Sequence, residues 1–267
     1  MPRGLCVPFA SGGLLRSYVT LSALSLDELA REYLESAAAD HPDSAPVFLA
    51  LADLRLREKD TSGALFAARK AVPDYTDYDF AALPKSLWDT LYPRNYWSLV
   101  ERQARASRLD PYVVMGLIRQ ESAFDPRAHS GSNALGLMQL LPQTLGSNHR
   151  KAVTSRRHSR RRARAGPRVN SSILYRPAFN IRAGCQYLGR LVQLFHGNLP
   201  EALAAYNAGD TRVHAWLEGG GFREPAEFVE TIPFEDTHAY VEEVLRDAAI
   251  YRQLLAGTAR FKHCPEN

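Results

Sequence analysis

The fold is decided by a segment near the middle of the chain, residues 110–142, which reads DPYVVMGLIRQESAFDPRAHSGSNALGLMQLLP. Asp110 is a good N-cap and Pro111 is tolerated at the first helical position, so this pair predicts the start of a helix. Apolar residues then recur at helical spacing and define one apolar stripe. The helix is expected to end before Asp125-Pro126, because proline disfavours helical geometry in the residue that precedes it.

One acidic residue, Glu121, falls on the apolar stripe of this helix. It follows Leu117 by four residues and Ile118 by three, and residues at these spacings share a helix face. A carboxylate on an apolar face is either paired in a salt bridge within a core or held in an apolar cleft. Burial in a cleft would raise the pKa of the carboxyl, which could then donate a proton near neutral pH.

The rest of the pattern predicts helices and no extended strand, so the expected fold class is all-α. Residues 25–71 read as helical pairs, which suit either a repeat array or an ordinary bundle. Farther along the chain, Asn180 is a plausible N-cap for a helix with its own apolar stripe. Pro200 is expected to open the next helix, and the last helix is expected at about 237–255.

Residues 73–106 are rich in proline and in aromatic residues. This composition is too aromatic for a flexible linker and predicts a packed connector. Stacking against sugar rings is the alternative role for such side chains, and structural packing is the favoured one.

The net charge of +4 comes from one basic segment and not from the whole chain. Nine Lys and Arg residues lie within 150–168 with no acidic residue, and without them 24 Lys and Arg would face 29 Asp and Glu. The segment 148–172 has almost no large apolar residues and is expected to be a loop. It could bind an anionic polymer such as nucleic acid, form a solvated insertion without function, or come from an out-of-frame reading of the gene. The last two are favoured, so no nucleic-acid partner is expected.

The composition of the chain argues against several classes of protein. With 267 residues and 45% of them hydrophobic, the chain can form one or two domains with cores, and it has no apolar run of about 18 residues that would span a membrane. The cysteines at 6, 185 and 264 are too widely spaced to predict a disulfide framework or a zinc site. No His, Cys or Asp cluster has ligand spacing, so no metal or other cofactor is expected. Residues 1–15 lack the features of a signal peptide.

Four motifs, in order along the chain, resemble those of the soluble lytic transglycosylase family. They are Glu121-Ser122-Ala123-Phe124-Asp125-Pro126, then Ala134 to Pro142, then Ala205-Tyr206-Asn207-Ala208-Gly209, and finally Glu230-Thr231-Ile232-Pro233-Phe234 followed by Tyr240-Val241. The resemblance implies an all-α chain in which a lysozyme-like catalytic domain follows the last helices of an α-superhelical region. The expected divisions are a helical region at 1–72, the connector at 73–106, the catalytic domain at 107–257 and a tail at 258–267.

The resemblance also implies peptidoglycan as the substrate. Glu121 would act as acid and then as base in cleaving the β-1,4 bond between N-acetylmuramic acid and N-acetylglucosamine, with formation of a 1,6-anhydro end. The implied substrate-binding residues are Ser130, Gln139, Tyr206, Asn207, Glu230 and Tyr240. A monomer in the bacterial envelope or periplasm is expected. The alternatives are a goose-type lysozyme hydrolase and a catalytically impaired peptidoglycan-binding fragment.

Three positions around the second motif carry specific expectations. Ser130 either reaches the cleft or forms a turn with its neighbours. Gly136 would permit a close backbone approach that turns the Gln139 amide toward the sugar. Asn133 stands where the family usually has glycine, and asparagine is the next best residue for a left-handed backbone conformation.

Overall fold

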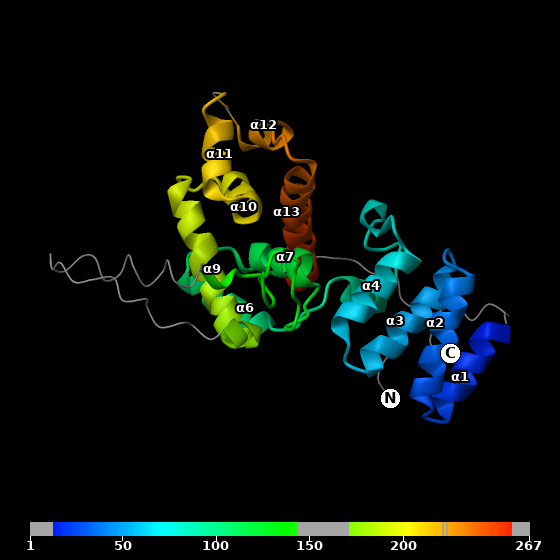
Figure 1. Ribbon diagram of the computed structural model, residues 1–267. Helices are drawn as coiled ribbons and strands as arrows, with labels where there is room; N and C mark the ends of the chain where they lie inside the picture. Colours follow the sequence, from blue (N-terminus) through cyan, green and yellow to red (C-terminus); the bar gives the residue numbers. More distant parts are fainter. Residues whose placement is uncertain (1–12, 144–170, 221, 223, 258–267) are drawn as a thin grey trace. The chain divides into compact units, whose positions relative to one another are not determined.

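The computed structural model describes residues 13–143, 171–220, 222 and 224–257, and its helices form two compact units (Figure 1). The first unit comprises the chain up to Asn95 and from Gln253 onward, and the second runs from Tyr96 to Arg252. The expected connector at 73–106 is therefore divided between the units. Of the basic segment at 148–172, only the last two residues are described, and the expected tail at 258–267 lies outside the described residues.

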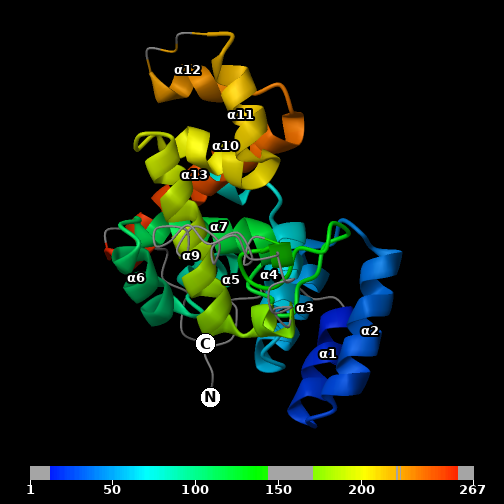
Figure 2. The same ribbon diagram turned by 60° about the vertical axis from the view of Figure 1, so that its left-hand side comes forward.

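The helices of the first unit pack mainly on their neighbours along the chain. They are α1 (Gly13–Ala23), α2 (Asp27–Asp40), α3 (Ala45–Arg57), α4 (Thr61–Ala71), the 3-10 helix η1 (Tyr75–Asp77) and α5 (Lys85–Leu91). Contacts run from α1 to α2, α2 to α3, α3 to α4 and α4 to α5, and α1 and α2 lie side by side in both views (Figures 1 and 2). This serial packing fits the helical pairs that the sequence predicts.

Three aromatic residues lie in the core of this unit. Tyr75, Trp88 and Tyr92 are buried, and their ring centroids lie 6.0–6.4 Å apart in mutual contacts. The Trp88 indole Nε1 donates a hydrogen bond of 3.2 Å to the Phe80 carbonyl. The side chains of Tyr75, Trp88 and Tyr92 therefore take the packing role and not the sugar-stacking role.

The second unit contains the remaining helices. They are α6 (Trp97–Ala106), α7 (Pro111–Ser122), the 3-10 helix η2 (Ser171–Tyr175), α9 (Pro177–Leu194), α10 (Leu199–Ala208), α11 (Asp210–Leu217), α12 (Pro225–Glu230) and α13 (Glu235–Leu255), whose last residues belong to the first unit. Isolated bridges join Leu135 to His129 and to Leu140, and the described residues contain no longer strand. The all-α expectation is confirmed. No described helix is both long and apolar enough to cross a membrane.

Helix α7 is held tightly against α13. Asp110 caps α7 as the sequence predicts, with Oδ1 accepting a hydrogen bond of 2.9 Å from the Tyr112 amide. The backbone of Gly116 approaches α13 so closely that a Cβ there would lie 2.7 Å from the Val244 carbonyl oxygen. One turn later, Arg119 and Asp247 form an ion pair of 2.7 Å in which both side chains are completely buried.

The prediction that Asn180 caps a helix is wrong. Helix α9 begins at Pro177, and Asn180 lies in its first turn with no exposed surface. Its side chain accepts a hydrogen bond from the Met138 amide and donates to the carbonyls of Leu135 and Leu174, each at 2.8 Å. A short amide side chain suits caps because it bonds to nearby backbone groups, and here the same property fixes a distant loop.

Candidate active site

Glu121 lies in the last turn of α7, where the chain leaves the helix abruptly. Ala123 and Phe124 both have positive φ, 48° and 66°, which is uncommon for residues other than glycine. The Ser122 hydroxyl donates a hydrogen bond of 2.9 Å to the Leu137 carbonyl, and the Phe124 side chain is buried. The helix end is thus fixed to the following loop, and the Glu121 carboxyl is held at their junction.

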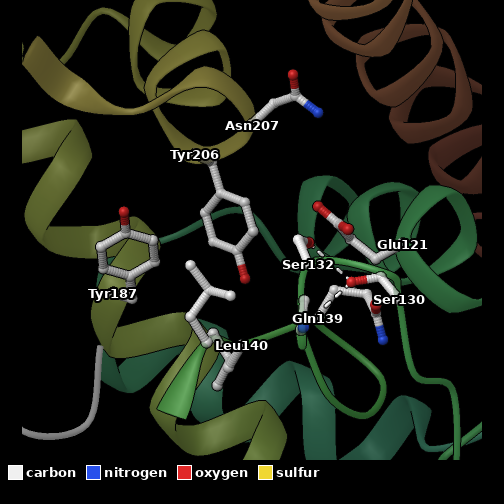
Figure 3. A pocket seen from close by; sticks show the side chains of 10 residues that line it. Glu121, Ser130, Ser132, Gln139, Leu140, Tyr187, Tyr206 and Asn207 are labelled. Carbon is white, nitrogen blue, oxygen red and sulfur yellow. Dashed lines mark hydrogen bonds between the residues drawn. The ribbon is translucent and has the colours of Figure 1, made fainter. Parts of the chain in front are cut away.

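Glu121 faces a cavity of about 310 Å³ (Figure 3). The cavity is lined by Glu121, Ser130, Ser132, Ala134, Gln139, Leu140, Leu141, Tyr187, Tyr206 and Asn207. These residues come from the end of α7, the loop that follows it, α9 and α10. Among them, Glu121 is the only residue with an ionisable acid or base other than the tyrosine hydroxyls.

The surroundings of Glu121 favour its neutral form. Burial raises the pKa of Glu121 from the ordinary value of 4.5 to about 7, and a hydrogen bond from Tyr240 lowers it by a smaller amount. The Tyr240 hydroxyl donates this bond to Glu121 Oε1 at 2.7 Å. A carboxyl with such a pKa is partly protonated near neutral pH and can act as a general acid.

Two tyrosines beside Glu121 stay protonated and differ in their partners. Burial, followed by the charge of Glu121, raises the pKa of both Tyr206 and Tyr240 well above its usual value. Tyr240 bonds to Glu121, whereas the Tyr206 hydroxyl donates a bond of 2.7 Å to the Met138 carbonyl. The Tyr206 ring packs against the Tyr187 ring with centroids 5.2 Å apart (Figure 3). Tyr206 therefore supports the loop, and Tyr240 contacts the acid directly.

Ser130 and Gln139 line the cavity and also build the loop around it. Ser130 Oγ accepts a bond of 3.1 Å from the Ala134 amide and lies 2.9 Å from Ser132 Oγ, so it has the turn-forming role as well as a cavity position. Gln139 Nε2 donates to the carbonyls of Gly136 and Ala128 at 2.9 and 3.2 Å. Both amide hydrogens are used in this way, and the Gln139 side-chain oxygen is the atom that can accept a bond from a ligand.

The loop depends on unusual backbone angles. Gly136 has φ +75°, and a Cβ there would lie 2.3 Å from the Leu174 carbonyl oxygen and 2.5 Å from Asn180 Nδ2. The backbone at Gly136 therefore lies very close to other protein groups, and its expected effect on a bound sugar stays a prediction. Asn133 has φ 63°, the left-handed conformation expected for a residue that replaces glycine.

The other two sequence-predicted residues take different positions. Asn207 lines the cavity, and its Oδ1 accepts a bond of 2.7 Å from Thr237, which links the end of α10 to the start of α13. Glu230 is the last residue of α12, is exposed, and is not among the residues that line the cavity. Its carboxylate lies beside His238 and Glu242 instead.

Tyr187 and Ser132 line the cavity but were not among the predicted site residues. Tyr187 precedes Leu188, a member of the apolar stripe of α9, so the stripe places it at the edge of the buried face. An aromatic residue in such a position is a signal for a cleft wall, because its ring can pack on one side and remain accessible on the other. Ser132 has no comparable signal in a run of small turn residues.

Comparison with known proteins identifies the second unit. A family profile described as "Transglycosylase SLT domain" matches residues 98–229. Residues 98–229 of the chain belong to this family. The soluble lytic murein transglycosylase of Salmonella typhimurium is 37% identical over 179 residues, which are 66% of this chain and 26% of the relative. The corresponding protein of Escherichia coli K12 is 35% identical over 180 residues. The chain spans about a quarter of the length of these curated relatives.

Solved structures resemble the SLT chain over nearly all of its length. An inactive glutamate-to-glutamine mutant of the lytic transglycosylase Slt from Pseudomonas aeruginosa gives a TM-score of 0.68 at 29% identity, covering 92% of this chain and 36% of that one. The 70 kDa soluble lytic transglycosylase of Escherichia coli gives 0.65 at 27% identity, covering 91% and 36%. These similarities confirm the family and the fold, a lysozyme-like all-α domain that follows a helical region.

Proposed function

We propose that this SLT chain is a peptidoglycan lytic transglycosylase in which Glu121 is the single acid and base. The observation that supports the proposal is a carboxyl at the cavity wall whose pKa is raised to about 7 by burial and which Tyr240 holds at 2.7 Å. The names of the relatives, soluble lytic murein transglycosylases, agree with this reaction.

In the proposed reaction, a glycan strand lies in the cavity with the bond between N-acetylmuramic acid and N-acetylglucosamine beside Glu121. Protonated Glu121 donates its proton to the bridging oxygen, and the bond from this oxygen to C1 breaks through an oxocarbenium-like state. The Glu121 carboxylate then accepts the proton of the C6 hydroxyl while O6 bonds to C1 of the same muramic acid. A 1,6-anhydro end and a free 4-hydroxyl result, no water is consumed, and Glu121 is protonated again.

The composition of the cavity wall favours this reaction over hydrolysis with two carboxyls. Retaining glycosidases place their two carboxyls about 5 Å apart and inverting enzymes about 6–9 Å apart. Among the described residues that line the cavity, Glu121 is the only carboxylic acid. Attack by a hydroxyl of the same sugar gains from proximity and needs no second carboxyl to activate a water molecule.

We assign substrate binding to the polar residues around Glu121. The Ser130 hydroxyl, the Gln139 side-chain oxygen and the Asn207 side-chain amide suit the hydroxyl and N-acetyl groups of the sugars. Tyr206 supplies a ring to the wall, and Tyr240 orients the acid. Glu230 would contact the strand outside the cavity. In this proposal the chain acts as a monomer on glycan strands in the bacterial envelope.

Digestion of purified peptidoglycan sacculi tests the proposal. The wild-type chain is expected to release muropeptides with 1,6-anhydro ends, which mass spectrometry separates from reducing ends because they are lighter by one water. Glu121→Gln should lower turnover by at least about a hundredfold, since a neutral amide cannot donate or accept the proton. Glu243→Gln, which alters an acid on α13 paired with Arg246, is the matched control and should keep full activity.

Three outcomes would contradict the proposal in different ways. Reducing ends in the product would indicate a lysozyme-type hydrolase. Binding to sacculi without released product would indicate a catalytically impaired fragment. Undiminished turnover by Glu121→Gln, with unchanged helix content by circular dichroism, would remove Glu121 from the reaction.

A further inference from the structure

Three potential metal ligands converge where α12 leads into α13, outside the cavity. Glu230 ends α12, and His238 and Glu242 lie one turn apart on α13 (Figure 1 shows the link between these helices). One ligand atom from each residue lies within 4.8 Å of the other two. Residues four apart share a helix face, so His238 and Glu242 project to the same side, and the short link brings Glu230 to them.

The Nε2 atom of His238 lacks a hydrogen-bond partner at the centre of this cluster. This atom is shielded from water and has no such partner among the described residues. The Glu242 carboxylate oxygen is 3.7 Å away, beyond hydrogen-bond distance. A desolvated ring nitrogen without a partner costs free energy. An ion placed between Nε2 and the two carboxylates would remove that cost.

We propose that Glu230, His238 and Glu242 bind a divalent transition-metal ion, with Zn²⁺ as the representative. Imidazole nitrogen together with carboxylate oxygen suits Zn²⁺, whereas Ca²⁺ and Mg²⁺ prefer ligand sets made of oxygen alone. Three protein ligands leave one tetrahedral position for water, and the exposure of Glu230 and Glu242 gives water access to it.

The spacing of the ligand atoms fits such an ion after small side-chain movements. Ligands at about 2.0–2.1 Å from a tetrahedral Zn²⁺ lie about 3.4 Å from one another. The 3.7 Å between His238 Nε2 and Glu242 Oε1 is only slightly longer. The backbone that carries the three ligands is fixed where α12 leads into α13. Ile232 is buried there, and the buried Thr237 donates a hydrogen bond of 2.7 Å to Asn207. The two exposed carboxylates can therefore close on the ion without moving the helices.

The sequence predicts no metal site because these ligands come from two elements. Only the pair His238 and Glu242 has a helical spacing that is visible along the chain, and such a pair is also common on solvated helices. Glu230 joins the pair through the turn between α12 and α13.

The site would link metal concentration to catalysis, a consequence that rests on the proposed function. Glu230 is assigned to substrate binding there, so an ion held by its carboxylate would compete with the strand. Zn²⁺ should therefore inhibit turnover, and Glu242→Gln should keep the basal turnover while losing most of this inhibition. The binding experiment that follows needs no activity, so failure of one proposal is distinct from failure of the other.

Calorimetric titration of the EDTA-treated full chain with ZnCl₂ tests the site, supported by the visible absorption of bound Co²⁺. Because other His and Cys residues occur in the chain, the readout is the number of binding events lost on substitution. His238→Ala and Glu242→Gln should each weaken the Zn²⁺ affinity of one site by at least about tenfold. A loss of this size follows even from substituting a residue that only hydrogen-bonds to a metal ligand. Glu243→Gln, the neighbouring acid paired with Arg246, should bind Zn²⁺ like the wild type, and MgCl₂ should give no heat from this site.

The same titration can overturn the proposal. Equal Zn²⁺ stoichiometry and affinity in the wild type and in both His238→Ala and Glu242→Gln would place all binding elsewhere. Absence of any Zn²⁺ binding by the wild type would exclude the site. Loss of binding in Glu243→Gln equal to that in Glu242→Gln would show a diffuse acidic surface and not these three ligands.

Discussion

Tyr240 donates a hydrogen bond of 2.7 Å to Glu121 across 119 residues of sequence. The bond joins α13 to the end of α7 at Glu121, the one acidic group among the described residues of the cavity wall. A donated hydrogen bond stabilises the charged carboxylate, while burial destabilises it and is the larger effect. The pKa of about 7 is the balance of the two, so Tyr240 helps to set the pH at which the acid loses its proton.

Tyr240→Phe should raise the pKa of Glu121, because burial then acts without the opposing hydrogen bond. Under the proposed mechanism, only protonated Glu121 starts the reaction, and activity declines as pH rises through its pKa. The declining limb of the kcat/KM profile against pH should therefore move to higher pH, by up to about one unit. Measuring turnover of sacculi between pH 5 and pH 9 would locate the limb.

Tyr206→Phe is the matched control for that substitution. It also removes a buried hydroxyl beside the cavity, but this hydroxyl donates to the Met138 carbonyl and not to Glu121. The declining limb of the pH profile of Tyr206→Phe should stay at the wild-type pH, whatever the change in turnover. An equal displacement of the limb in both variants, or none in Tyr240→Phe, would mean that the Tyr240 hydrogen bond does not control the acid.

Glu121→Gln should stabilise the folded chain at high pH more than at low pH. Folding raises the pKa of Glu121 from 4.5 to about 7, so the folded state binds the proton more tightly than the unfolded state does. The wild type therefore loses stability as pH rises from about 4.5 to 7, and the glutamine variant lacks this loss. The free energies of unfolding should differ between the proteins by about 3 kcal/mol more at pH 8 than at pH 4.5. Urea denaturation at both pH values measures this, and an equal difference at the two would contradict it.

Local sequence signals correctly predicted where α7 begins and ends. Asp110 and Asp125-Pro126 bracket α7 because capping and the restriction before proline act over a few residues. The position of Glu121 on an apolar stripe indicated that burial would raise the pKa of its carboxyl. In the structure, burial does raise this pKa. Helical periodicity reports which face of a helix is buried, and this is sufficient for a single side chain on that face.

The sequence does not reveal which distant groups meet on that face. Asn180 has the composition of a cap, yet its side chain bonds to Leu135 and Met138, more than 40 residues earlier. Tyr240 was expected only to line the cleft, and its bond to Glu121 depends on the packing of α13 against α7. Periodicity cannot encode such a partner, because the pairing is set by how two helices cross in the folded chain.

The buried pair of Arg119 and Asp247 should be essential for the stability of α7 on α13. Asp247→Ala leaves a charged guanidinium with no exposed surface and without its 2.7 Å partner, and it also removes the acceptor for Gln120. The free energy of unfolding should fall by about 3–5 kcal/mol. The double substitution Arg119→Met and Asp247→Leu should recover most of that loss, because both buried charges are removed. Urea denaturation of the three proteins measures the difference.

A partly exposed pair on the same helix is the control. Glu243 and Arg246 approach to only 4.0 Å at the surface, and Glu243→Ala should change the free energy of unfolding by less than about 1 kcal/mol. Equal losses for Asp247→Ala and Glu243→Ala would contradict a special role for the buried pair. A double variant no more stable than Asp247→Ala would show that the loss comes from packing and not from breaking the ion pair.

Gly136→Ala should destabilise the chain far more than Gly197→Ala, although both glycines have positive φ, +75° and +92°. A Cβ at Gly197 meets no atom within 4 Å, so that variant bears only the conformational cost of about 1–2 kcal/mol. A Cβ at Gly136 would also overlap the Leu174 carbonyl and the Asn180 amide, which three hydrogen bonds hold in place. This overpacking should add roughly 1–3 kcal/mol and disturb the loop that carries Gln139. Urea denaturation compares the two variants, and equal losses would mean that the loop yields to the methyl group without cost.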